Sequence, residues 1–288
     1  MGKTVSIIGI GALGKTLARA LELQGYKIYS LFNRTVSKAE DLGSELNAGI
    51  VGSIPESAGD LGELTFITVA DDAIGAVTGQ LAGQLWDLSS CTIAHCSGNE
   101  SSEILEPLSG AGAEIAAFHP LQTFNPTSAP GIFRDIYISL EGQAGAVDQL
   151  ELVVSRLGAH PLHVTPEAKS YLHAAAVMAS NYLITLVHLS GEIAGLGGVD
   201  PWEARKALHA LVRTTAENAS AEKLSSVLSG PIARGDLKTV KKHVQLLEQN
   251  EHLASLYKRL GLETVALARQ KEGITDEEVV QITKLLKD

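Results

Sequence analysis

The stretch Val5-Ser6-Ile7-Ile8-Gly9-Ile10-Gly11-Ala12-Leu13-Gly14 joins an apolar, strand-like run to a glycine-rich turn with G-x-G-x-x-G spacing. Gly9 permits a tight turn, Gly11 lets an anion approach the backbone, and Gly14 allows a helix to pack closely on the strand. Free N–H groups and the helix dipole favour an anion at that helix start. The pattern predicts a turn that binds a dinucleotide pyrophosphate, with Ala12 and Leu13 beside it; the alternative is a glycine-rich turn without a ligand.

The next strand-like run ends in Leu31-Phe32-Asn33-Arg34-Thr35, about 20 residues beyond the turn, where an NAD site usually offers a carboxylate to the ribose. No carboxylate is present here to repel a 2′-phosphate. The Arg34 guanidinium can bind that phosphate in a forked geometry, while Asn33 and Thr35 donate further hydrogen bonds. The segment therefore predicts NADP as the cofactor, and a solvated surface arginine is the alternative.

Apolar runs alternate with helical patterns over the first part of the chain. The runs are 4–9, 27–32, 64–69, 92–95, 115–118 and 136–140, and the interleaved helical patterns include 37–46 and 72–81. Such alternation predicts an α/β fold with a doubly wound, mostly parallel sheet of the Rossmann type. After Pro166 the strand signals stop, and helical spacing covers 171–196, 202–218, 236–249, 251–267 and 276–286. We expect a dinucleotide-binding domain over 1–165 and an all-helical substrate and dimerisation domain over 166–288.

Composition narrows the class of protein. The chain has 288 residues, and a net charge of −10 argues against binding to a nucleic-acid backbone. Two cysteines, Cys91 and Cys96, are too few for a disulfide framework and offer no zinc-finger spacing. The chain runs from Met1-Gly2-Lys3 directly into a strand-like segment without the pattern of a signal peptide. We expect a cytoplasmic protein that acts on a small-molecule substrate.

One charge-free stretch, 172–191, is long enough to span a bilayer. It contains His173, Ser180, Asn181, His188 and Ser190, polar groups that suit a helix buried in protein better than one facing lipid. We therefore expect no membrane span.

Two further segments follow predicted strands at the edge where ligands of open α/β sheets collect. The segment Thr68-Val69-Ala70-Asp71-Asp72-Ala73-Ile74 suggests cofactor contacts from Ala70, Asp71 and Ile74, although Asp72 equally suits a helix cap. Ser97-Gly98 follows the run at His95-Cys96 and is expected at the cofactor as well. Cys96 suits a small buried side chain better than a nucleophile.

The whole chain resembles a bacterial family that pairs a Rossmann-like domain with a C-terminal module named domain of unknown function 2520. The segments that carry the resemblance are 118–124 (FHPLQTF), 180–182 (SNY) and 229–236 (SGPIARGD), together with the glycine-rich turn. The layout is more distantly similar to pyrroline-5-carboxylate reductase, deazaflavin-dependent NADP reductases, and 6-phosphogluconate and β-hydroxyacid dehydrogenases. These resemblances imply a helical domain built around a long buried helix, and homodimers formed through the helical domains.

The helix that starts near Tyr171 is where such relatives place groups that contact substrate. Helical spacing puts His173, Ser180 and Asn181 within one stripe about 100° wide. β-Hydroxyacid dehydrogenases carry a lysine as proton donor one turn before the asparagine, and here that position is Val177. The departure places transfer of their mechanism in question.

Histidine is the substitute acid that the sequence offers, and His119 and His173 are the candidates, with Asn181 beside them. A purely structural role is the alternative for each histidine. Gln122, Ser180 and Arg234 are expected around the substrate, with Arg234 able to bind a carboxylate through two hydrogen bonds or else to tie two helices together. His160 and His163 form at most a weak metal pair without a third ligand, so no metal site is expected.

These features predict an NADP-dependent oxidoreductase that transfers hydride between NADPH and a small oxo or imino acid. Within enzymes, the alternative is an activity like that of prephenate dehydrogenase or pyrroline-5-carboxylate reductase. Outside enzymes, the alternatives are a non-catalytic NADP sensor, which Val177 encourages, and a structural dimerisation protein with a vestigial fold.

Overall fold

The computed structural model describes residues 3–84, 86–221, 223–271 and 273–287, so Met1-Gly2 lies outside it. The chain forms two compact units, Met1–Ser180 and Asn181–Asp288. The first unit thus includes the helix α6 (Pro166–Ala179), which follows the last strand. The first third of the stretch expected to form one long helix therefore belongs with the sheet.

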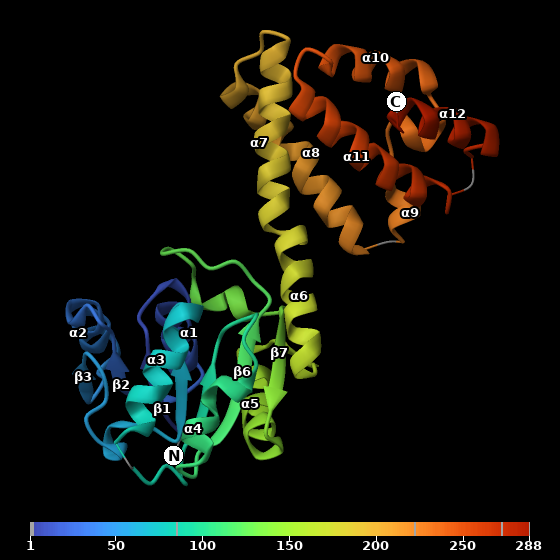
Figure 1. Ribbon diagram of the computed structural model, residues 1–288. Helices are drawn as coiled ribbons and strands as arrows, with labels where there is room; N and C mark the ends of the chain where they lie inside the picture. Colours follow the sequence, from blue (N-terminus) through green and yellow to red (C-terminus); the bar gives the residue numbers. More distant parts are fainter. Residues whose placement is uncertain (1–2, 85, 222, 272, 288) are drawn as a thin grey trace. The chain divides into compact units, whose positions relative to one another are not determined.

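An eight-stranded sheet runs through the first unit in the order β3-β2-β1-β4-β5-β6-β7-β8 (Figure 1). The strands are β1 (Thr4–Ile8), β2 (Lys27–Phe32), β3 (Ile50–Gly52), β4 (Leu64–Ile67), β5 (Thr92–His95), β6 (Glu114–Pro120), β7 (Tyr137–Gly142) and β8 (His160–His163). Only the β6–β7 pair is antiparallel. The predicted α/β class and the mostly parallel, doubly wound sheet are confirmed. Strands β3 and β8 were missed because three or four residues, with a proline in β8, show no readable alternation.

Two hydrophobic cores lie on opposite faces of the sheet, as the alternation of side chains along a strand requires. Ile7 and Phe66 belong to one core, and their chain neighbours Ile8 and Ile67 belong to the other. The first core is covered by α1 (Ala12–Leu23), α2 (Val36–Leu46), α5 (Ala144–Leu157) and the 3₁₀ turn η3 (Pro130–Phe133). The second is covered by α3 (Asp71–Ala82), α4 (Glu106–Ser109) and the turns η1 (Ala58–Asp60) and η2 (Ser102–Leu105).

Helices make up the second unit within the residues that the structure describes. They are α7 (Asn181–Leu196), α8 (Pro201–Ala221), α9 (Leu224–Val227), η4 (Ile232–Arg234), α10 (Leu237–Leu247), α11 (Glu251–Ala268) and α12 (Asp276–Lys287). Three of them begin at side-chain caps: Asp200 accepts from the backbone of Glu203, Asp236 from Thr239, and Thr275 from Glu278. A core around Val240, Val265 and Ile282 joins the last three helices.

The expected single helix over 171–196 is interrupted at Ser180, so that prediction needs correction. Ser180 leaves ideal helical geometry, with φ −113° and ψ −68°. Its hydroxyl shares a 3.2 Å hydrogen bond with Thr123 of the first unit. A serine side chain with a partner of its own competes with the regular helix, and the chain continues as α7 from Asn181.

By length and composition, the stretch Pro166–Leu196 could cross a membrane, with a mean hydropathy of 1.4 in its most apolar window. Its α6 part carries the buried side chain of Lys169. The α7 part has many exposed apolar side chains, including Tyr182, Ile184 and Leu186, so the expectation of a helix buried within the chain is wrong for this part. This exposed face is a property of the second unit that needs its own explanation.

Candidate functional site

The glycine-rich turn has the geometry that its sequence predicts. Gly9 has φ +109°, a conformation that other residues rarely adopt, and its N–H donates to the Phe32 carbonyl at 2.7 Å. A Cβ on Gly14 would collide with the Gly9 carbonyl oxygen, so only glycine lets α1 pack here. By contrast, a Cβ on Gly11, the N-cap of α1, would meet open space. The start of α1, with Ala12 and Leu13 partly exposed, is therefore free to receive an anion.

Asn33 ties the end of β2 to this turn. Its Oδ1 accepts a hydrogen bond from the Ile10 N–H at 2.9 Å, and its Nδ2 donates to the Thr35 carbonyl at 2.9 Å. Both ends of the amide are thus used to hold the backbone. The side chains of Arg34 and Thr35 are exposed beside it. Asn33 shapes the site, and Arg34 is the group that can reach a phosphate.

The segment after β4 differs in part from its prediction. Ala70 is the N-cap of α3, and Asp71 and Asp72 lie in the first turn, so the expectation of Asp72 as the cap is wrong. Ala70 and Asp71 are exposed at the carboxyl edge of the sheet. Ile74 is fully buried in the second hydrophobic core, where helical spacing turns it inward.

Strand register brings polar side chains into two neighbouring rows at the carboxyl edge of β5 and β6. His95 pairs with Ala117, and Ala117 pairs with Glu141 across the antiparallel β6–β7 contact. The next row on the same face contains His119 opposite Ser139. Residues that are paired across strands share one face of a sheet. The small side chain of Ala117 therefore separates a buried histidine from a buried glutamate.

The 97–102 loop follows β5 and lies against both candidate histidines. A Cβ on Gly98 would lie only 2.6 Å from His119 Cε1 and from His173 Nδ1, so the two imidazoles contact the Gly98 backbone. Their ring centroids are 6.0 Å apart, with the rings tilted by 63°. His173 Nδ1 is buried without a hydrogen-bond partner within the described residues. The structure thus brings together Ser97, Gly98, His119 and His173.

Lys169 is a site residue that the sequence reasoning missed. Its side chain is only 1% exposed, and its Nζ donates to the Ser97 carbonyl at 2.9 Å. A signal was available, because Lys169 is the only lysine or arginine between Arg156 and Arg205. It also lies four residues before His173, so both side chains fall on one face of α6. A lysine is therefore present, two turns before Val177 on the same run of helix.

Burial and the Lys169 charge control how the buried groups titrate. Burial, aided by Lys169, lowers the pKa of His95 to about 4. Burial also lowers the pKa of His119 to about 4, with Lys169 and His173 acting in the same direction. The pKa of Lys169 itself is lowered by burial, an effect that Glu141 opposes. Burial raises the pKa of the Cys96 thiol to about 12, which fits the expected inert role.

The other predicted residues lie at several places. Gln122 is exposed after β6, and its Oε1 accepts from the Thr123 N–H at 2.8 Å. Ser180 ends the first unit, bonded to Thr123. Asn181 and Arg234 belong to the second unit, where both are exposed.

The histidines of β8 have surface roles. His163 Nε2 pairs with Glu151 at 2.6 Å, and the His160 ring lies on Tyr137 with centroids 5.2 Å apart. Within the described residues, no group of three or more histidine, cysteine or carboxylate side chains could hold a metal ion.

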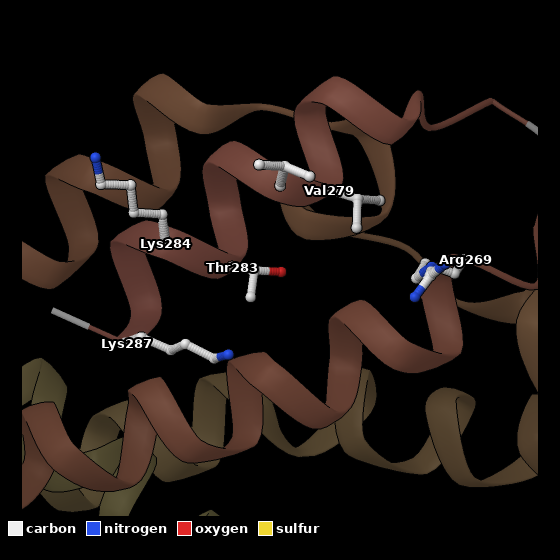
Figure 2. A pocket seen from close by; sticks show the side chains of 6 residues that line it. Arg269, Val279, Thr283, Lys284 and Lys287 are labelled. Carbon is white, nitrogen blue, oxygen red and sulfur yellow. The ribbon is translucent and has the colours of Figure 1, made fainter.

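A separate hollow of about 450 Å³ lies on α11 and α12 of the second unit (Figure 2). Arg269, Lys284 and Lys287 surround it, together with Val279 and Thr283. Lys284 and Lys287 occupy the last turn of α12, where cations interact favourably with the helix dipole. That interaction accounts for the positive charge without a ligand.

Two family profiles cover most of the chain. Residues 2–120 match the Rossmann-like domain, and residues 136–264 match DUF2520, a domain of unknown function. The chain belongs to the Rossmann-like proteins with a DUF2520 domain. The predicted family is therefore confirmed. No curated protein matches the chain.

Solved structures with the same layout span nearly the whole chain. A Thermotoga maritima protein is 25% identical with a TM-score of 0.75, covering 92% of this chain and 98% of its own. A Bacteroides fragilis protein, provisionally described as an NADP oxidoreductase, is 21% identical with a TM-score of 0.71, at 91% and 98% coverage. A reductive aminase from Aspergillus terreus, solved with NADPH and ethyl-5-oxohexanoate, is 18% identical with a TM-score of 0.62, at 100% and 99% coverage. At these identities the likeness supports the fold of both parts of the chain.

Proposed function

We propose that this DUF2520 protein is an NADP-dependent oxidoreductase that reduces the C=O or C=N group of a small oxo or imino acid. One observation carries the proposal. The open glycine-rich helix start and the pair of histidines that contact Gly98 lie at the carboxyl edge of one sheet, the edge where open α/β sheets bind ligands. The named activities of the Bacteroides and Aspergillus proteins support the same class of reaction.

The residues present fit a phosphorylated dinucleotide. Gly11 leaves space at the N-terminus of α1 for a pyrophosphate, and Arg34 is exposed beside it for a 2′-phosphate. Bound NADPH would supply the hydride. Ser97 and Gly98, on the loop after β5, would border its reactive end. We therefore favour NADPH over NADH.

The substrate would lie against His119 and His173. Because the pKa of His119 is lowered to about 4, its imidazole is neutral at pH 7, so it would donate a hydrogen bond to the substrate's oxygen or nitrogen rather than act as the acid expected from the sequence. The proton that completes the reduction would come from water. The unpartnered His173 Nδ1 is a second polar group for the same substrate. Lys169 adds a buried positive charge, which stabilises the negative charge that develops as hydride arrives. The two histidines would thus orient the acceptor, and Lys169 would supply the charge.

We further propose that the protein is a homodimer through the helical unit. Exposed apolar side chains cover α7 and α8, among them Tyr182, Ile184, Trp202 and Leu211. An apolar face of this extent is typical of an interface. Its occupant would be a second copy, as in the families that the chain resembles. Both cysteines are free and buried, which suits the reducing cytoplasm that we propose for it.

The test is NADPH oxidation by the purified protein over a panel of oxo acids, imines and imino acids. We expect turnover with at least one small acid, and its loss in His119→Ala and His173→Ala variants that still bind NADPH. Stoichiometric NADPH binding without turnover over the whole panel would favour the sensor alternative. Unchanged turnover in both variants would remove histidine from the mechanism.

A further inference from the structure

Glu141 is a buried carboxylate that the proposed reaction has not used. Its side chain lies on β7, 6% exposed, and both of its oxygens accept hydrogen bonds from Ser102. The Ser102 N–H donates at 2.8 Å and the Ser102 hydroxyl at 2.6 Å. Among the described residues, no charged side-chain nitrogen of lysine, arginine or histidine lies within 4 Å of its oxygens. A buried carboxylate so held needs a positive charge nearby to offset its desolvation.

Lys169 carries the opposite charge and is also buried, so its ammonium group too has lost its contact with water. An ammonium group has three N–H donors, and Ser97 accepts from one of them. Lys169 and Glu141 therefore bind opposite ends of one short loop, at Ser97 and at Ser102. Of the charges near Lys169, Glu141 is the one that most favours its protonated form.

His95 fixes the loop between these two ends. The Ser97 N–H donates to His95 Nδ1 at 3.2 Å, so Nδ1 is the unprotonated nitrogen. His95 Nε2 must then carry the proton, which it donates to the Ser101 carbonyl at 3.1 Å. A neutral imidazole satisfies both bonds and an imidazolium would not. The loop is thus held at Ser97, Ser101 and Ser102, which leaves Gly98 fixed against His119 and His173.

We propose that Glu141 is a positioning residue that keeps Lys169 charged in its buried place and, with Lys169 and His95, holds the Gly98 backbone against the two histidines. The role rests on the proposed function, because it is through Lys169 that Glu141 would act on the substrate. The effect of Glu141 on the protonation of Lys169 is also present in the protein without substrate, where it can be tested.

Several titratable groups near Lys169 affect its protonation. Glu141 on β7 is the main stabilising charge, and Asp71 and Glu100 act in the same direction, whereas the Cys96 thiol is uncharged at pH 7. His95 and His119 are neutral at pH 7, because their pKa values are lowered to about 4. Glu141 is the buried member of the carboxylates, since Asp71 is exposed and Glu100 is partly so. Its charge is therefore the least screened by solvent.

The experiment is an NMR titration of the full chain carrying ¹³C-labelled lysine, with the Lys169 signal assigned by its loss in Lys169→Met. In Glu141→Gln, which keeps an acceptor for Ser102 but removes the charge, we expect the pKa of Lys169 to fall by about one unit or more. Glu103→Gln, an exposed neighbour on the adjacent turn, is the matched control and should leave it unchanged. An unchanged Lys169 titration in Glu141→Gln would overturn the proposal.

Three further measurements keep the test decisive. If Glu141→Gln does not fold, Glu141→Asp retains the charge and should fold with Lys169 still protonated at neutral pH; a neutral Lys169 there would contradict the proposal. In Lys169→Met, imidazole ¹⁵N shifts should show the pKa of His95 rising above about 4. If the enzyme is active, the basic limb of its kcat profile should move to lower pH in Glu141→Gln while NADPH affinity holds. Failure of turnover alone bears on the proposed function and leaves the NMR result standing.

Discussion

The central strands and the helix α7 treat apolar residues in opposite ways. Every residue of β4 and β5 is buried, whereas Gly191 is the only buried residue of α7. Yet α7 is rich in apolar side chains such as Ile184, which is 69% exposed. The central strands bury their apolar residues within the chain, and the helical unit leaves an apolar face that a second chain would cover. We therefore propose that the first region carries the chemistry and the second the assembly.

The tightest packing in the sheet unit gives the largest expected effect. Gly14→Ala places a Cβ against the backbone of Gly9, which should lower the free energy of unfolding by roughly 4 kcal/mol. Gly11→Ala is the matched control, because its Cβ meets open space and should cost about 1 kcal/mol or less. Chemical denaturation of both variants measures the difference. Equal losses would show that the turn is not packed as described.

Acid should destabilise the sheet unit in a defined window. His95 in the unfolded chain takes up a proton near pH 6.5, but in the folded protein only near pH 4. Between these values the unfolded chain binds more protons, so stability is complete above the window and declines as the pH falls through it. His95 alone contributes about 3 kcal/mol to this decline, and His119, whose pKa is also about 4, adds to it.

Denaturation curves at a series of pH values check this decline. The slope should shrink in His95→Asn and persist in His163→Asn, a surface histidine. A stability that stays flat between these pH values would contradict a neutral, buried His95.

A charge introduced on the exposed face of α7 should change the oligomeric state more than the free energy of unfolding. Ile184→Glu puts a carboxylate into the apolar face of α7 and should shift a dimer toward monomers, while the free energy of unfolding changes by about 1 kcal/mol or less. Sedimentation velocity over a concentration series measures the shift. A wild-type monomer at every concentration would remove the proposed role of this face.

The same contrast explains how far the sequence could predict the structure. Strong local signals were sufficient for β1 and its glycine turn. Weak or short signals were not: β3 and β8 are too brief to show periodicity, and the break at Ser180 depends on Thr123, a residue distant in sequence. Local pattern cannot report a partner that only the fold brings close.

The residues of the candidate site also differ in whether the sequence could predict them. Gly9, Gly11, Gly14 and Arg34 follow from a motif whose spacing has a physical reason. Lys169 and Glu141 could not be predicted from a motif. They are brought to one loop by burial and by the strand register across β6 and β7, which only the fold shows. Ile74 shows the converse, since a residue near the expected cofactor faces the core instead.

The dinucleotide site is best tested by parallel titration of NADPH and NADH into the wild-type protein, Gly11→Ala and Arg34→Asp. We predict that the wild type prefers NADPH, that Gly11→Ala stays folded but binds both dinucleotides more weakly, and that Arg34→Asp loses about ten-fold in NADPH affinity, or about 1.4 kcal/mol. Equal affinity of the wild type for the two would contradict the role of Arg34. Absence of binding to either would contradict the dinucleotide site, and with it the proposed enzyme.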